Sequence, residues 1–169
     1  DYLKDFCKVV YLERTKNISS TMLRTSKTSI QRIGIIGTGR IANRFIPEAA
    51  LVSGVNTEAV YNPRFESAKV FGERWRINAY GDLEEFYRST DIIYIASPHQ
   101  THYEYIKKSL EHGKHVLCEK PMCLSKSQAE ELFDCAARKN LVLFEGIKTA
   151  YCPGFSKLLG IACSGMIGE

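Results

Sequence analysis

Residues 33–42 constrain the fold of this chain most, and they read I-G-I-I-G-T-G-R-I-A. The first four are apolar or glycine, which is typical of a short buried strand. Gly37, Gly39 and Ala42 then complete G-x-G-x-x-A, one of the two accepted forms of the dinucleotide-binding fingerprint. In that fingerprint the glycines permit a tight turn and a close backbone approach to a pyrophosphate, and the alanine lets the next helix pack closely. Taken alone, the motif is equally compatible with an ordinary tight turn.

The helix expected after this turn would present free backbone N–H groups and the positive end of its dipole to bound phosphates. The sequence therefore predicts one continuous cofactor-binding segment. Its residues are Gly37, Thr38, Gly39, Arg40, Ile41 and Ala42.

From residue 30 onward, strand-like and helix-like segments alternate, which indicates a parallel sheet with crossover helices. We expect strands at 32–36, 56–61, 78–80, 92–96, 115–118 and 141–144. Helices are expected at 40–52, 63–75 and 82–88, from residue 102 to Gly113, from Ser125 onward, and at 155–163. This order predicts an α/β protein whose sheet is parallel, doubly wound and of Rossmann type.

Several residues predict where these helices begin, end and face. Pro47 lies inside the first helix, so we expect a kink or an early break there. Pro63 suits the start of the second helix, and Asp82 and Ser125 are good N-caps for later ones. The buried face of the helix after Ser125 is predicted to comprise Ala129, Leu132, Phe133, Ala136 and Ala137.

The net charge of +4 comes wholly from the first 32 residues, which hold seven Lys or Arg and three Asp or Glu. This segment has no dense basic cluster and no motif that recognises nucleic acid. We therefore expect residues 1–29 to be a disordered extension that binds neither nucleic acid nor membrane. The chain has no apolar run near the roughly 20 residues of a membrane helix. It opens on Asp1, so we regard it as a candidate fragment, with Met22 a candidate natural start.

The six cysteines show no C-x-x-C spacing and no accompanying histidine cluster, so we expect no metal site. No apolar signal segment precedes a cleavage site, which favours reduced thiols in a cytoplasmic protein. The cysteines are Cys7, Cys118, Cys123, Cys135, Cys152 and Cys163.

Polar residues gather where the predicted strands end, and ligands of open α/β sheets bind at that edge. At the end of the second strand, Asn62 stands where an NAD site usually has an acidic residue, and Arg64 follows. A missing carboxylate beside a guanidinium favours a 2′-phosphate, so we predict NADP as the preferred cofactor and NAD as the alternative. The other interpretation is a plain turn at Asn62 and a solvated Arg64.

The ends of the fourth and fifth strands supply further candidates. Lys120, between Glu119 and Pro121, could relay a proton during hydride transfer, or could simply pair with Glu119 at the surface. His99 and His102 are candidate cofactor or substrate contacts, although loop histidines also serve structural roles. The pair formed by Ser97 and Pro98 either shapes a nicotinamide-receiving loop or is only a turn.

Three motifs together resemble the N-terminal domain of the glucose–fructose oxidoreductase, inositol dehydrogenase and rhizopine-catabolism family, known as Gfo/Idh/MocA. They are G-I-I-G-T-G-R-I-A at 34–42, A-S-P-H-Q-T-H at 96–102 and G-K-H-V-L-C-E-K-P-M at 113–122. The resemblance implies an NAD(P)-dependent oxidoreductase acting on a sugar, polyol or related hydroxy or keto compound.

The same resemblance implies roles for single residues. Ser97, Pro98, His99 and His102 would lie along the ribose–nicotinamide side of the cofactor, with His99 where many members carry Asn. Glu119 would contact the nicotinamide ribose, and Lys120 would be the catalytic lysine, in a Lys–Pro bond that is often cis.

Length is the main departure from the family. We expect a Rossmann domain at 30–149 and, at 150–169, only the beginning of a second α/β domain that in this family supplies the substrate pocket and the oligomer interface. The chain alone is therefore expected to bind cofactor with little turnover, and a homo-oligomer is expected only of a full-length protein. The alternative function is a non-catalytic dinucleotide-binding sensor or regulatory module.

Overall fold

The structure is a computed structural model, and it describes residues 30–166. The predicted extension 1–29, with Cys7 and Met22, lies outside the described residues.

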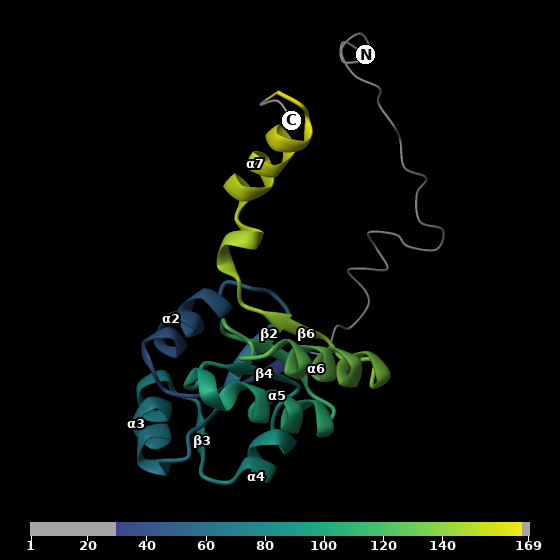
Figure 1. The fold of residues 1–169 in the computed structure, drawn as a ribbon. Coiled ribbons are helices and arrows are strands. Elements are labelled where there is room, and N and C mark those ends of the chain that lie inside the picture. The colour runs from purple at the N-terminus through teal and green to yellow at the C-terminus, as the bar shows by residue number, and fades with distance from the viewer. Residues whose placement is uncertain (1–29, 167–169) are drawn as a thin grey trace, which may run out of the picture.

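A single six-stranded sheet forms the centre of the domain, with the strand order β3-β2-β1-β4-β5-β6 (Figure 1). Every neighbouring pair of strands is parallel. The chain therefore winds outward in both directions from the β1–β4 pair, which confirms the predicted doubly wound Rossmann-type sheet. The strands are β1 (Gln31–Ile36), β2 (Val55–Tyr61), β3 (Asn78–Tyr80), β4 (Ile92–Ile95), β5 (His115–Cys118) and β6 (Leu143–Glu145).

Helices cover both faces of the sheet and bury its apolar side chains in two layers. Ile35 packs on the side of α2 and α3, whereas Ile36 packs on the side of α4, α5 and α6, and both are fully buried. Successive strand residues point to opposite faces, so a parallel strand with helices on both sides must be apolar throughout. The helices are α2 (Arg40–Ala49), α3 (Phe65–Trp75), α4 (Leu83–Arg88), α5 (His102–Glu111), α6 (Lys126–Arg138) and α7 (Pro153–Cys163), with short 3-10 turns η2 (His99–Thr101) and η3 (Lys148–Tyr151).

Two helices beside the sheet differ from their predicted bounds. Helix α2 ends at Ala49, three residues before the predicted end, and it continues through Pro47 for two residues. The prediction that α3 starts at Pro63 is wrong, because the Asn62 side chain accepts a hydrogen bond from the Arg64 N–H at 2.9 Å. That bond holds Arg64 in an extended conformation, and α3 begins only at Phe65.

The buried face of α6 is narrower than predicted. Leu132 and Ala136 are buried, but Phe133 is half exposed and Ala137 is exposed. Neighbouring residues on a helix lie about 100° apart, so only one of these two i, i+4 stripes can face the sheet. The predicted N-caps are confirmed, since Asp82 accepts from the Glu85 N–H at 2.9 Å and Ser125 accepts from the Gln128 N–H at 3.3 Å.

Helix α7 begins at Pro153, two residues earlier than predicted, and extends away from the sheet (Figure 1). Its apolar residues Leu158 and Leu159 are exposed. Within residues 30–166, no helix is both long and apolar enough to cross a membrane.

An ion pair ties the amino ends of the two central strands together. The Arg32 guanidinium donates to both Asp91 carboxylate oxygens at 3.0 and 2.9 Å, and the Arg32 N–H donates to the same carboxylate at 2.9 Å. The hydrogen bonds from Arg32 hold the pKa of Asp91 below its usual value.

We predict that this pair stabilises the fold in a pH-dependent manner. Because the pKa of Asp91 is lower in the folded protein than in the unfolded chain, its stabilisation is present above the unfolded pKa and is lost as the pH falls through the folded value. The difference in free energy of unfolding between the wild type and Asp91→Asn should be constant near neutral pH and shrink below about pH 4. Denaturant titrations across this range measure it, and a pH-independent difference would contradict the prediction.

Candidate functional site

The predicted site residues all follow the carboxyl ends of strands, at one edge of the sheet. The central strands β1 and β4 are neighbours there, and the connections that follow them lead to opposite faces of the sheet. A crevice forms at such a reversal of strand order, and it is where open α/β sheets bind ligands. The described structure therefore brings the candidate residues that follow β1, β2, β4 and β5 to the same edge.

Gly37 lies in close contact with the end of β4. It has a φ of +109°, and a Cβ at this position would lie 2.6 Å from the carbonyl oxygen of Ala96. Its own N–H donates to the Tyr61 carbonyl at 3.0 Å. Both the backbone conformation and the space thus require glycine, so the turn is packed against the ends of β2 and β4.

Gly39 differs, because no contact within residues 30–166 requires a glycine there. Its backbone is extended, with φ −76°, and a Cβ would meet no atom within 4 Å. Helix α2, which starts at the next residue, has no side-chain N-cap and no acidic residue in its first turn, and Arg40 is exposed at its start. The open space, the unpartnered helix start and the positive charge all suit a phosphate.

Asn43, in the first turn of α2, holds the glycine turn in place, and it is not one of the residues predicted from the sequence motifs. Its amide nitrogen donates to the Gly39 carbonyl at 2.9 Å, and its amide oxygen accepts from the Trp75 indole at 3.0 Å. The glycine turn is thereby anchored to the far end of α3. The sequence feature that could have indicated Asn43 is a polar residue one helical turn after Gly39. Ala42, fully buried, packs as the fingerprint requires.

Asn62 joins the ends of β1 and β2. Its amide nitrogen donates to the Thr38 hydroxyl at 2.9 Å, while its oxygen holds the Arg64 N–H. The side chain therefore serves as a spacer between two loops, and Arg64 stands exposed at the start of α3 beside them.

The loop after β4 is held by its own side chains. The Ser97 hydroxyl lies 2.8 Å from that of Thr101, which donates to the Pro98 carbonyl at 2.7 Å. His99 is exposed on this loop, but the His102 ring is completely buried beneath it. Both ring nitrogens of His102 lie at hydrogen-bond distance from backbone carbonyls, which leaves neither for a direct contact with a cofactor.

Glu119, the first residue after β5, is hydrogen-bonded to Tyr94 of β4. The Tyr94 hydroxyl donates to the Glu119 carboxylate at 2.7 Å, and its ring stacks on Phe45 with centroids 3.8 Å apart. Burial and the bond to Glu119 raise the pKa of the Tyr94 hydroxyl, which keeps it a donor. Tyr94 is a further residue that sequence reasoning missed, hidden within an apolar strand.

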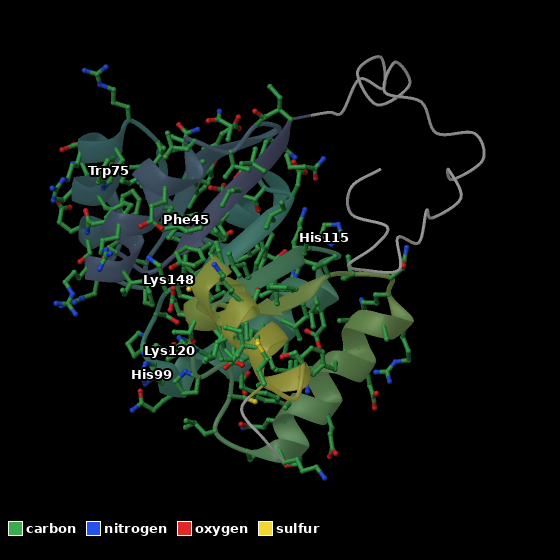
Figure 2. All side chains as sticks on the ribbon, turned by 90° about the horizontal axis from the view of Figure 1, so that it is seen from above. Phe45, Trp75, His99, His115, Lys120 and Lys148 are labelled. Atoms are coloured by element: carbon green, nitrogen blue, oxygen red, sulfur yellow. The ribbon has the colours of Figure 1, made fainter. Side chains whose placement is uncertain are left out.

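Lys120 is exposed, and the Lys120–Pro121 peptide bond is cis, as the family resemblance implied. In the part of the chain that the structure describes, no ion pair joins Lys120 to Glu119, so the alternative of a simple surface pair gains no support. In the view of Figure 2, Lys120 and His99 both lie in the lower left part of the molecule and Trp75 lies in the upper left part. The loop is also held at Met122, whose N–H donates to the Glu145 carboxylate at 2.7 Å.

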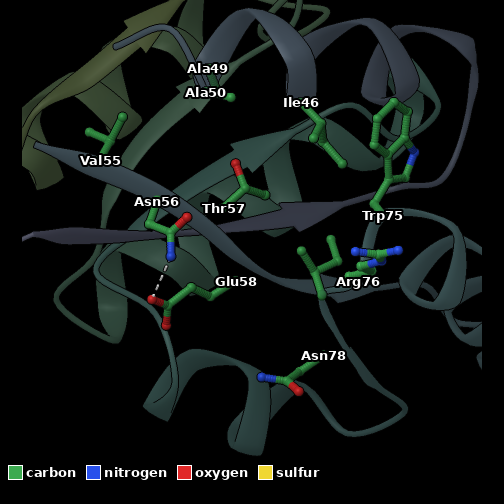
Figure 3. A pocket seen from close by; sticks show the side chains of 11 residues that line it. Ile46, Ala49, Ala50, Val55, Asn56, Thr57, Glu58, Trp75, Arg76 and Asn78 are labelled. Atoms are coloured by element: carbon green, nitrogen blue, oxygen red, sulfur yellow. Dashed lines mark hydrogen bonds between the residues drawn. The ribbon is translucent and has the colours of Figure 1, made fainter. Parts of the chain in front are cut away.

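A groove of about 660 Å³ lies beside Lys120, lined by α2, by β4 and β5, and by residues 144–149. Its walls include Phe45, Tyr94, Leu117, Glu119 and Lys120. A second hollow of about 420 Å³ lies at the opposite edge, between the ends of α2 and α3 (Figure 3). Its lining contains Trp75 and Glu58 but none of the predicted site residues.

Residues 30–166 contain no group of three or more His, Cys, Asp or Glu side chains placed to hold a metal ion. The five cysteines of that range are free thiols. Burial raises the pKa of the Cys118 thiol, so this cysteine next to the site is unreactive as a nucleophile near neutral pH.

The sheet order, the glycine turn and the open helix start define a dinucleotide-binding domain of Rossmann type. Residues 31–147 match the sequence model of an oxidoreductase family with an NAD-binding Rossmann fold, GFO_IDH_MocA. The chain belongs to this Gfo/Idh/MocA family.

Curated relatives and solved structures agree with that assignment. The chain is 38% identical to scyllo-inositol 2-dehydrogenase (NADP(+)) IolU of Bacillus subtilis, over 75% of this chain and 40% of that protein. It is 33% identical to trans-1,2-dihydrobenzene-1,2-diol dehydrogenase of Xenopus laevis, over 80% of this chain and 43% of that protein. The crystal structure of KijD10, a 3-ketoreductase from Actinomadura kijaniata, in complex with NADP superimposes with a TM-score of 0.75 at 31% identity, over 82% of this chain and 45% of that one. The chain thus spans less than half the length of these proteins.

The two glycines of the turn should differ in how much they contribute to stability. We predict that Gly37→Ala lowers the free energy of unfolding by more than about 1 kcal/mol, because the new Cβ meets the β4 backbone at a positive φ. Gly39→Ala should change it by less than about 0.5 kcal/mol, since its Cβ enters open space. Urea unfolding of both variants checks this, and equal losses of stability would contradict it.

Proposed function

We propose that this chain binds NADP(H) across the β1–β4 crevice and is the cofactor-binding part of an oxidoreductase that acts on a sugar, polyol or related hydroxy or keto compound. The observation that carries the proposal is the start of α2, where Gly39 leaves open space before an uncapped, non-acidic helix N-terminus.

The fit of the residues supports one orientation of the cofactor. The backbone of residues 37–42 would hold the pyrophosphate, with Arg40 adding positive charge. Arg64 would pair with the 2′-phosphate at the end of β2, where Asn62 replaces the carboxylate that an NAD site uses. The nicotinamide half would then lie across the ends of β4 and β5, beside Ser97, Pro98 and His99, with Glu119 at its ribose.

When bound, the cofactor supplies the hydride acceptor or donor. Lys120, exposed at the end of β5, would hold the substrate oxygen and move a proton to or from it as the hydride is transferred. Tyr94 and Glu145 hold the loop on both sides of Lys120 and so limit where its amine can reach. The apolar groove beside Lys120 would help to exclude water.

The names of the relatives support the substrate class, since they include an inositol dehydrogenase and a 3-ketoreductase. Because those proteins are more than twice as long as the matched segment, the division at residues 149–150, the assembly state and the cytoplasmic location stay predictions. Selection among sugars or polyols would depend on a substrate-binding domain.

The cofactor preference is tested by titrating the chain with NADPH and NADH and following nicotinamide fluorescence. Loss of a charge-assisted hydrogen bond predicts that Arg64→Ala weakens NADPH binding at least about tenfold and leaves NADH binding unchanged. Arg88→Ala, which removes an exposed arginine from α4, is the matched control and should bind like the wild type. Equal affinity of the wild type for both cofactors, unaffected by Arg64→Ala, would overturn the NADP assignment.

The proposed role of Lys120 separates turnover from binding. In a protein that carries this chain and oxidises a polyol with NADP+, Lys120→Ala should lower kcat by about a hundredfold or more while the affinity for cofactor changes little. Steady-state kinetics and cofactor titration of the same preparation measure both quantities. Retained turnover would remove Lys120 from the mechanism.

A further inference from the structure

His102, the first residue of α5, contacts two loops that lie far apart in the sequence. Its Nδ1 lies 2.8 Å from the Pro121 carbonyl oxygen in the loop after β5. Its Nε2 lies 2.9 Å from the Ser97 carbonyl oxygen in the loop after β4. The ring is fully buried, so water cannot substitute for either contact without a rearrangement of the loops.

The two loops in contact with His102 are those proposed to flank the nicotinamide half of the cofactor. Each has other local supports, since Thr101 holds the Pro98 carbonyl and Glu145 holds the Met122 N–H. These two contacts each fix one loop, whereas the imidazole ring touches both. The strand ends below the loops are joined by the Glu119 N–H, which donates to the Ile95 carbonyl at 2.9 Å. Beyond that bond, the His102 ring spans the gap between the Ser97 and Pro121 backbones.

We propose that His102 is a positioning residue that sets the separation of the Ser97 and Lys120 loops and thereby shapes the nicotinamide subsite, an inference that rests on the proposed cofactor binding. The ring itself does not touch the cofactor, because both nitrogens face the protein backbone. Carbonyl oxygens only accept hydrogen bonds, so the bond to either loop is made by an N–H of the ring, and the ring lies within hydrogen-bond distance of both loops.

Two substitutions separate the contacts. The amide nitrogen of asparagine can reach the place of Nδ1, so His102→Asn retains a donor for the Pro121 carbonyl and loses the one for Ser97. The longer glutamine places its amide nitrogen near Nε2, so His102→Gln retains the Ser97 contact and loses Pro121. Each variant thus keeps a polar side chain at the site while it uncouples the loops.

The test compares two ligands on the same chain. NADPH reports on the whole cofactor site, whereas 2′,5′-ADP reports only on the glycine turn and the end of β2. We expect both variants to bind NADPH about five- to tenfold more weakly, the effect of one lost hydrogen bond, with 2′,5′-ADP affinity unchanged. Ser109→Ala, which removes another buried polar side chain from α5, is the matched control and should leave both affinities unchanged.

Two outcomes would overturn the proposal. One is unchanged NADPH affinity in both His102 variants, and the other is a parallel loss of NADPH and 2′,5′-ADP affinity, which would mark a purely structural role. Failure of the wild-type chain to bind either ligand would instead overturn the proposed function itself.

Discussion

The close contact of Gly37 with the end of β4 is the constraint on which the rest of the site depends. The Gly37 N–H is bonded to the end of β2, and its Cα lies against the Ala96 carbonyl with no room for a side chain. The chain can therefore turn sharply out of β1 and start α2 directly above the junction of the two halves of the sheet. The helix N-terminus, with its unpartnered N–H groups, faces the crevice as a consequence.

Polar contacts beneath the surface then place the side chains that surround this crevice. Asn62 spaces the first two loops, Tyr94 holds Glu119, and His102 spans the loops after β4 and β5. The polar atoms of these residues form hydrogen bonds within the protein. Arg64, His99 and Lys120, in contrast, are exposed at the carboxyl ends of the strands. The site thus has two layers. The buried residues hold the loops in place, and the exposed residues are proposed to bind the cofactor or take part in the reaction.

Sequence patterns were sufficient for the parallel, doubly wound sheet and for the gathering of polar residues at one edge, because apolar parallel strands alternate regularly with their connections along the chain. They were not sufficient where the outcome depends on one particular hydrogen bond of a side chain. The late start of α3 depends on the Asn62 bond to Arg64, and the burial of His102 depends on carbonyls of two other loops. Likewise, periodicity could not decide whether the stripe of Leu132 or that of Phe133 faces the sheet, since only the packing of α6 decides it.

Backbone amide NMR of the chain during titration with NADP+ shows whether the cofactor binds across the β1–β4 crevice. We predict the largest shift changes at residues 37–42, 62–64, 97–99 and 119–121, with little change around the hollow lined by Trp75 at the opposite edge. No change at the glycine turn under saturating NADP+, or changes confined to the Trp75 hollow, would contradict binding at the crevice.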